Sequence, residues 1–203
     1  MSGEREVSVF RLWLGAVAII ALATTLLVVL PTLSLRDVPP PDGLAPYTAD
    51  QLRGRQVYIA NGCVYCHSQQ PRDPSVGPDQ QRGWGRPSVP GDYHYDEPHL
   101  LGTMRTGPDL LNIAVRQPSR DWHLGHLYQP RAYLPGSIMP AYPFLFERRR
   151  GTTPQPGEVV VALPPGVAPA GTRVVATPDA LALVDYLLSL DRSYPVTRAE
   201  TPR

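Results

Sequence analysis

The stretch Cys63-Val64-Tyr65-Cys66-His67 decides the fold of this chain. The pattern C-x-x-C-H is typical of the covalent attachment site of c-type haem. Two thiols three residues apart on a helical turn can reach both vinyl groups of one porphyrin, and the adjacent histidine then provides an axial ligand to the iron. The alternatives are a thioredoxin-like redox pair, a zinc half-site and a local disulfide. No strand pattern precedes the motif, which disfavours the redox pair, and two cysteines in the whole chain disfavour a zinc site.

The composition restricts what the remaining chain does. A formal net charge of +1 gives no basic footprint for nucleic acid. The 25 prolines and 17 glycines predict a loop-rich soluble part with few and short regular elements. Because every cationic side chain is an arginine, any surface for an anionic partner uses guanidinium groups. Both cysteines belong to the motif, so no structural disulfide is expected.

An uncharged apolar run near the N-terminus predicts a membrane anchor over residues 1–35. The run Leu12–Leu30 has 19 residues, and at ~1.5 Å per residue it nearly spans a ~30 Å hydrocarbon core. We expect Pro31 to end the span. A cleaved signal peptide is the alternative, but its apolar core is shorter, about 7–15 residues, and a small-residue cleavage site follows it. No such site follows this run, which favours a retained anchor.

The orientation follows from charge and from the haem motif. Arg5 and Arg11 precede the span and Arg36 follows it, which mildly favours a cytoplasmic N-terminus. In bacteria c-type haem is attached outside the cytoplasm. We therefore expect a single-pass protein of the bacterial inner membrane, in contact with membrane lipid, with residues 36–203 in the periplasm.

Two helices are predicted in the soluble part. Thr48 begins a capping box, and a helix is expected to run from there to about Gly62, directly before the motif. Thr177 followed by Pro178 indicates the start of a second helix, which carries an apolar stripe. In haem c domains the first and last helices cross at a glycine, so by analogy we expect Gly54 to contact Tyr186 or Leu183.

The predicted fold is mainly α. It comprises a single N-terminal transmembrane helix, a proline-rich linker over 36–47, and a loop-rich class I cytochrome c domain over 48–195, followed by a tail over 196–203. A small β-hairpin is predicted within an insertion at about 151–176. Its two strands are expected at 159–163 and 172–176, where β-branched residues flank a Pro/Gly-rich turn.

A second iron ligand is sought among the methionines, because methionine opposite histidine raises the potential of an electron-carrying haem. Met139 precedes a proline and therefore lies in an extended loop that can cross the distal face of the haem. Met104 lies just before a turn that suits the proximal side. In that turn the Pro108 carbonyl is expected to accept the Nδ1 proton of His67.

Other polar side chains provide weaker candidates. Arg105 and Arg131 flank the two haem loops, and we expect them to bind the haem propionates through bidentate hydrogen bonds, with solvated surface charges as the alternative. His123 and His126 follow a tryptophan at helical spacing and suit a place beside the propionates. They also represent the alternative of a bis-histidine haem.

Several segments together resemble the membrane-anchored monohaem subunit, subunit II, of cbb3-type cytochrome c oxidases. The resemblance covers roughly Leu44 to Pro143, and the anchor and the last helix agree with it. C-x-x-C-H alone is generic, whereas the extended set is specific. Its members, in order, are Gly54–Tyr58, Gly62–Gln69, Tyr95–Pro98, Arg105–Leu110, Trp122-His123, His126-Leu127, Pro130-Arg131 and Ser137–Pro143.

The resemblance implies that Cys63 and Cys66 hold one covalent haem c and that His67 and Met139 ligate its iron. It implies a polytopic haem–copper catalytic subunit as partner, together with a cytochrome c electron donor and other cytochrome c subunits. The chain has no second redox motif and no acid–base constellation, so it is expected to transfer electrons and not to catalyse alone. The alternatives are the anchored monohaem subunit of a nitric oxide reductase, a free-standing tethered cytochrome c shuttle and a tethered thiol oxidoreductase.

Overall fold

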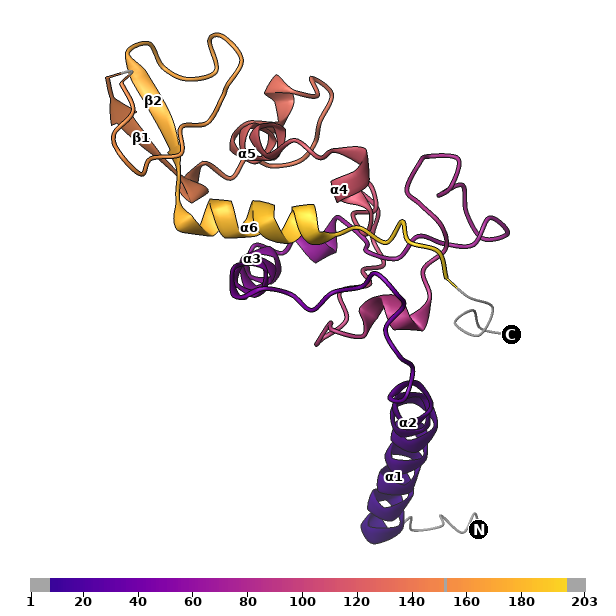
Figure 1. Ribbon diagram of the computed structural model, residues 1–203. Helices are drawn as coiled ribbons and strands as arrows, with labels where there is room; N and C mark the ends of the chain where they lie inside the picture. The colour runs from indigo at the N-terminus through magenta and orange to yellow at the C-terminus, as the bar shows by residue number, and fades with distance from the viewer. Residues whose placement is uncertain (1–7, 152, 197–203) are drawn as a thin grey trace. The chain divides into compact units, whose positions relative to one another are not determined.

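The computed structural model describes residues 8–151 and 153–196, which form two compact units that divide after Pro39 (Figure 1). The first unit is one apolar helix. The second unit begins at Pro40 and is mainly helical, with one small antiparallel sheet. Apart from its first residue, the predicted tail over 196–203 lies outside the described residues, as does Arg5 of the charge argument.

The first unit consists of α1 (Val9–Thr24), a π-helical turn (Thr25–Val29) and α2 (Leu30–Leu35), which continue one another. Within the described part of the chain, Val9–Leu35 is one helix that is long and apolar enough to cross a membrane, by length and composition. The hydroxyls of Thr25 and Ser34 each donate to the backbone carbonyl four residues earlier, at 2.8 Å. These hydroxyls are therefore satisfied inside the helix, as an apolar surrounding requires.

The prediction that Pro31 ends this helix is wrong, because α2 continues to Leu35. Proline lacks an N–H, and its ring crowds the carbonyl four residues earlier. The wider turn directly before Pro31 relieves that crowding: the Leu30 N–H donates to the carbonyl of Thr25, five residues back.

The second unit is built on α3 (Ala49–Ala60) and α6 (Pro178–Ser189), and the predicted starts of both helices are confirmed. At α3, the Thr48 Oγ1 accepts from the Gln51 N–H at 3.2 Å, and the Gln51 side chain accepts from the Thr48 N–H at 2.8 Å. At α6, the Thr177 hydroxyl accepts from the N–H of Ala180 at 3.3 Å. These bonds satisfy backbone donors that the first helical turn leaves without partners.

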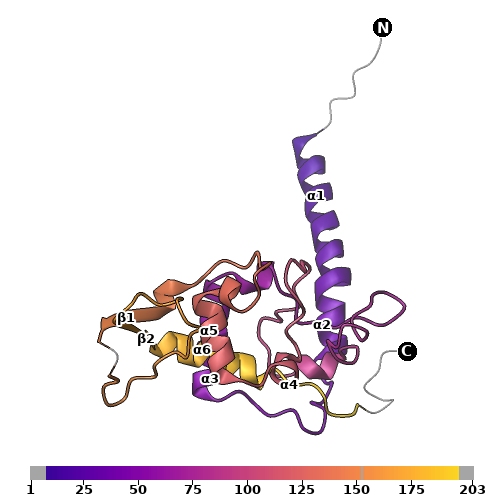
Figure 2. The same cartoon turned by 90° about the horizontal axis from the view of Figure 1, so that it is seen from above.

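The two helices cross in close contact, as both ribbon views show (Figures 1 and 2). A Cβ at Gly54 would collide with the Ala182 carbonyl and lie 2.9 Å from the Leu183 nitrogen, so only glycine fits this contact. The expected partner Leu183 is confirmed. Tyr186 instead packs edge-on against Tyr58 of α3, with ring centroids 5.5 Å apart, and both rings are buried.

Shorter elements and loops fill the chain between these helices. They are α4 (Ile113–Arg116), α5 (Arg120–Tyr128) and four 3-10 turns, at Cys63–Tyr65, Pro90–Tyr93, Pro130–Ala132 and Pro143–Leu145. The buried Arg55 of α3 joins one of the loops to the core. Its guanidinium pairs with Asp96 at 3.2 Å and donates to the carbonyls of Glu97 and Pro98. Two of the quoted motif segments therefore meet at this arginine.

The sheet contains β1 (Phe146–Arg150) and β2 (Thr172–Ala176), antiparallel, in the register Phe146↔Ala176 to Arg150↔Thr172. The strand predicted over 172–176 is confirmed, but its main partner is β1 and not the predicted segment 159–163. Residues 159–163 contribute one bridge, Val160↔Val175, on the other side of β2. The true partner carries four consecutive charged residues, so it lacks the apolar alternation by which a strand is recognised.

Candidate functional site

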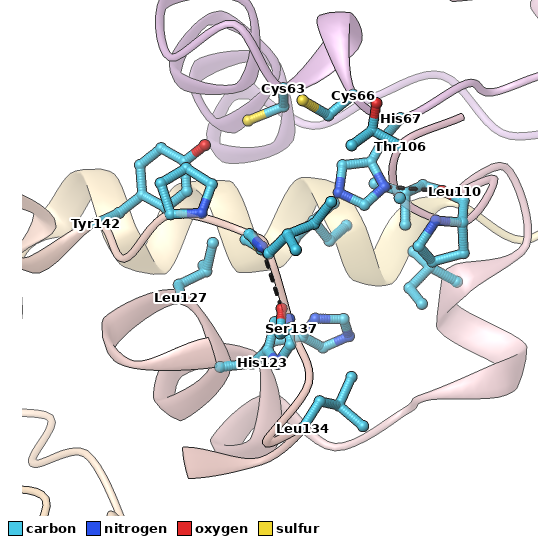
Figure 3. A pocket seen from close by; sticks show the side chains of 18 of the residues that line it. Cys63, Cys66, His67, Thr106, Leu110, His123, Leu127, Leu134, Ser137 and Tyr142 are labelled. Carbon is cyan, nitrogen blue, oxygen red and sulfur yellow. Dashed lines mark hydrogen bonds between the residues drawn. The ribbon is translucent and has the colours of Figure 1, made fainter. Parts of the chain in front are cut away.

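The two cysteines reach one wall of a cavity because of a tight turn after α3. Gly62 adopts a left-handed conformation, with φ of 68°, and a 3-10 turn over Cys63–Tyr65 follows it. The N–H groups of Cys66 and His67 both donate to the Cys63 carbonyl, at 3.1 and 3.0 Å. The turn thus presents two thiols and an imidazole to the same space (Figure 3).

His67 is held by the loop that contains Pro108. Its Nδ1 lies 2.7 Å from the Pro108 carbonyl oxygen, which accepts the ring proton and leaves Nε2 with its lone pair free. Burial lowers the pKa of His67, while this hydrogen bond opposes the shift. The ring lies against the backbone of Gly107, where a Cβ would come within 2.7 Å of Nδ1 and 2.8 Å of Nε2. Orientation and protonation state both suit a metal ligand.

A buried polar network fixes this loop to the motif. The Asp109 carboxylate accepts from the Ser68 hydroxyl at 2.6 Å and from the Gln70 N–H at 2.7 Å. Arg105 donates to the Ser68 oxygen at 3.0 Å and pairs with Asp79 at 2.6 Å. The segments after the motif and around Pro108 are therefore one rigid support for His67.

The cavity has a volume of about 540 Å³ and a mainly apolar lining. This volume falls in the range of pockets for small molecules and cofactors, ~300–1,000 Å³. Side chains from the motif, from α5 and from the loop after α5 face it (Figure 3). The residues that line it, besides glycines, are Cys63, Cys66, His67, Thr106, Pro108, Leu110, Ile113, Trp122, His123, His126, Leu127, Leu134, Pro135, Ser137, Ile138, Met139, Pro140, Tyr142 and Leu187.

Met139 lines this cavity, whereas Met104 does not and is 57% exposed. The loop before Met139 is held by the Ser137 hydroxyl, which accepts from the Met139 N–H at 3.2 Å. The Tyr142 N–H donates to the Leu127 carbonyl at 2.9 Å, which joins the end of the loop to α5. The structure therefore brings Met139 to the same cavity as Cys63, Cys66 and His67.

The arginine candidates lie elsewhere. Neither Arg105 nor Arg131 lines the cavity. The guanidinium of Arg105 is used by the network described above and by the Gln70 carbonyl, at 2.7 Å. Arg131 is exposed on the 3-10 turn after α5. A propionate contact of either arginine stays a prediction, and the structure gives Arg105 a supporting role that sequence analysis missed.

His123 and His126 of α5 both line the cavity, but their side chains have different partners. His123 is buried, and its Nε2 lies 2.8 Å from the Gln117 carbonyl oxygen. The ring of His126 stacks on Trp122, with centroids 4.4 Å apart and an angle of 10°. Its Nδ1 is buried and has no hydrogen-bond partner among the described residues. Burial, with the nearby His123 and His67, lowers the pKa of His126 to about 4.

These residues fit a covalently held haem. Cys63 and Cys66 are free thiols, not a disulfide. Burial raises the pKa of Cys63 to about 11, the opposite of the lowered pKa of catalytic redox thiols. Among the described residues, no group of three or more His, Cys, Asp or Glu side chains is arranged to hold a metal ion. Two thiols beside an imidazole on one wall of an apolar cavity are the donor set that a covalently attached haem requires.

The family model described as cytochrome c oxidase, mono-haem subunit/FixO matches residues 3–168, more than half of the chain. The chain belongs to this family. The resemblance to subunit II of cbb3-type oxidases is therefore confirmed. No curated protein matches the chain.

As a mono-haem subunit of cytochrome c oxidase, the protein holds one haem and is one part of an oxidase complex with other subunits. The apolar helix Val9–Leu35 fits a membrane-anchored subunit. The matched range includes the motif, the Pro108 loop and Met139, and it ends before β2 and α6.

Proposed function

We propose that this mono-haem subunit binds its haem covalently through Cys63 and Cys66, with His67 and Met139 as the two axial ligands of the iron. One observation carries the proposal: two thiols, an imidazole and a thioether, from two separate segments of the chain, line a single apolar cavity. When bound, the haem supplies reversible one-electron chemistry. Apolar surroundings and a methionine ligand both favour a raised reduction potential.

The chain's own residues prepare the site. Pro108 accepts the Nδ1 proton of His67 and so keeps Nε2 directed at the cavity. Asp109 and Arg105 hold the loop that carries Pro108. Ser137 restrains the loop that carries Met139. Such fixed surroundings limit how far the ligands move when the charge of the iron changes.

We infer that the second unit is a class I cytochrome c domain. Three features support this: a helix that leads into the C-x-x-C-H motif, a last helix that crosses it at Gly54, and a methionine loop on the cavity. The small sheet is then an insertion between the methionine loop and the last helix, close to the predicted range 151–176.

The subunit would receive electrons from a cytochrome c donor and pass them to a polytopic haem–copper subunit that reduces oxygen, in the company of other cytochrome c subunits. Leu134 and Ile138 line the cavity and are 53% and 71% exposed, so apolar side chains lie both in the cavity and on the surface. Such a surface suits contact with a redox partner. The anchor would place the N-terminus in the cytoplasm and the haem unit in the periplasm, with membrane lipid around Val9–Leu35.

Haem retention tests the proposal. The variant Cys63→Ser/Cys66→Ser should lose all covalently bound haem on a denaturing gel stained for haem, whereas the parent chain retains it. Retention of haem by the double variant would refute the attachment. Metal analysis of the co-purified large subunit then identifies the reaction: copper supports the oxidase, and non-haem iron would indicate a nitric oxide reductase.

A further inference from the structure

Among the described residues, no strand pairs with the side of β1 that faces away from β2. The hydrogen bonds next to β1 show which backbone groups face that side. At one end, the Thr177 N–H donates to the Leu145 carbonyl at 3.2 Å; at the other, the Gly151 N–H donates to the Gly171 carbonyl at 2.8 Å. In an antiparallel pair, residues alternate between facing the partner strand and facing away from it. Odd-numbered residues of this strand therefore bond to β2, and the amide groups of even-numbered residues face away.

Those outward groups form what we call the outer edge of β1: the backbone N–H groups of Arg148 and Arg150 and the carbonyl of Arg148. None of the three has a hydrogen bond to any described residue outside the sheet. The Arg150 carbonyl already accepts from the Arg173 side chain, at 2.7 Å. Arg148 and Arg150 are both exposed. An exposed strand edge is a template for another strand.

The charges on the sheet are unequally distributed. Arg149 pairs with Glu147 at 2.6 Å and with Glu158 at 2.5 Å, and Arg173 pairs with Glu158 at 2.8 Å. Two guanidinium groups and two carboxylates thus balance one another. Arg148 and Arg150 have no ion pair among the described residues. Two uncompensated positive charges therefore stand beside the unpaired amide groups.

The unpaired backbone groups and the two arginines together indicate which kind of segment can bind the outer edge of β1. A second copy pairing antiparallel about Arg148 would place the two Arg148 side chains directly opposite each other, which is unfavourable, and would place each Arg150 opposite Phe146, which provides no carboxylate. An extended segment with carboxylates meets both the amide groups and the guanidinium groups, which bind carboxylates bidentately. The ring of Phe144, 66% exposed and two residues before β1, offers an adjacent apolar contact.

We propose that the outer edge of β1 binds an acidic, extended segment of another subunit of the oxidase complex, which adds to the sheet as a strand. The proposal goes beyond electron transfer and does not depend on the haem ligands, so haem content serves as an independent readout.

Amide hydrogen exchange in the peptide that contains β1 tests the proposal. In the complex purified from membranes, the amides of Arg148 and Arg150 should exchange about tenfold or more slowly than in the isolated full-length chain in detergent. Equal rates in the two samples would overturn the proposal. Protection of the isolated chain by vesicles of an anionic phospholipid, with none in the complex, would also overturn it, in favour of a lipid site.

Substitutions separate strand addition from simple charge attraction. Arg148→Gln removes the charge and keeps the N–H, whereas Arg148→Pro also removes the outward N–H without touching a bond to β2. The proline variant should lose several-fold more of the protection in the complex than the glutamine variant. Equal losses would refute strand addition. Unchanged haem content and melting temperature of both variants establish that they fold.

A charge reversal tests the acidic character of the partner. Arg148→Glu/Arg150→Glu should reduce retention of the chain in the complex during a salt wash several-fold. The control is Arg82→Glu, which reverses one exposed charge outside the sheet and is compared with each single reversal, Arg148→Glu and Arg150→Glu, as well as with the double variant. If the control has the same effect as the double variant, the partner does not recognise this edge and the proposal fails.

Discussion

Met139 and Met104 are chemically identical side chains in opposite surroundings. Met139 packs against the core and lines the cavity with His67, whereas Met104 is exposed outside it. A thioether can act as an iron ligand when a fixed loop holds it at the cofactor, and of the two methionines Met139 lies in the cavity where we propose that the haem binds. A substitution of Met139 therefore tests the ligand assignment, and the same substitution of Met104 is its control.

Met139→Ala should leave the haem covalently attached and lower its reduction potential, because the iron loses the ligand that raises it. Axial ligands set haem potentials over a range of about 0.8 V. A potentiometric titration of the purified chain measures the change, and Met104→Ala should leave the potential at the parent value. A parent-like potential in Met139→Ala would show that another group ligates the iron.

At the residue scale, the sequence singled out Cys63, Cys66, His67 and Met139, which all line the cavity, but it did not predict the side chains that support them. The motif and the methionine loop follow from local patterns. The Pro108 hydrogen bond joins residues 41 apart, and it was expected because a haem-ligating histidine commonly donates its other ring proton to a backbone carbonyl. Arg105 is predicted to bind a propionate because its charge and position suit one, and the structure shows that it also bonds to Asp79 and Ser68, which are 26 and 37 residues away. No local pattern reveals a pairing over such separations. The Trp122–His126 stack had a signal, since four residues separate the two on one helix face.

At the scale of elements, the crossing of α3 and α6 depends on one missing methyl group. Gly54→Ala would place a Cβ against the Ala182 carbonyl, and the helices would have to separate. Overpacking of this kind costs about 1–3 kcal/mol. Urea denaturation of the haem-loaded protein measures the loss. The matched control is Gln56→Ala, at an exposed position of the same helix, which should change stability by less than ~0.5 kcal/mol.

The sheet predicts a pH dependence. The hydrogen bond from Arg173 lowers the pKa of Glu158 to about 2 from its ordinary value near 4.5. Because the folded state binds this proton less readily, the carboxylate stabilises the sheet fully above about pH 4.5, and that contribution is lost as the pH falls through about 2.

An NMR titration of the Glu158 carboxyl should give a midpoint near 2. Arg173→Gln should move the midpoint toward 4.5, and Arg148→Gln, which removes a charge that makes no pair with Glu158, should leave it in place. A midpoint near 4.5 in the parent protein would mean that the Glu158 pairs do not hold in solution.

Element prediction succeeded where caps carry the signal and failed where distant contacts decide. Thr48 and Thr177 define helix starts through bonds within three residues, so both starts were predictable. The strand Phe146–Arg150 was not, because its residues read as a charged surface run and only the pairing with β2 makes it a strand. Pro31 was taken as a helix end, since the sequence does not reveal the wider turn that accommodates it.

At the scale of the whole molecule, the chain divides into an apolar helix and a second, mainly helical unit, and the helix should remain in the mature protein. Leu22 lies at the middle of Val9–Leu35. A charged residue at the centre of a membrane helix costs about 2.5–3.5 kcal/mol on insertion scales. Leu22→Arg should therefore reduce the amount of chain that resists an alkaline wash of the membranes, whereas Leu35→Arg at the helix end should not.

The intact mass of the mature chain provides the complementary measurement. A mass that includes residues 9–35 supports a retained anchor. Loss of these residues would identify the helix as a cleaved targeting segment and would leave the second unit without attachment of its own.

The π-helical turn before Pro31 has a consequence for any helix that packs along Val9–Leu35. One additional residue in a turn rotates every later side chain by about 100° around the axis, relative to an uninterrupted α-helix. The line of side chains that faces one way along Val9–Thr24 therefore faces another way along Leu30–Leu35. A helix that packs along Val9–Thr24 therefore does not meet the same row of side chains along Leu30–Leu35. Each part of the helix can contact a different neighbouring helix.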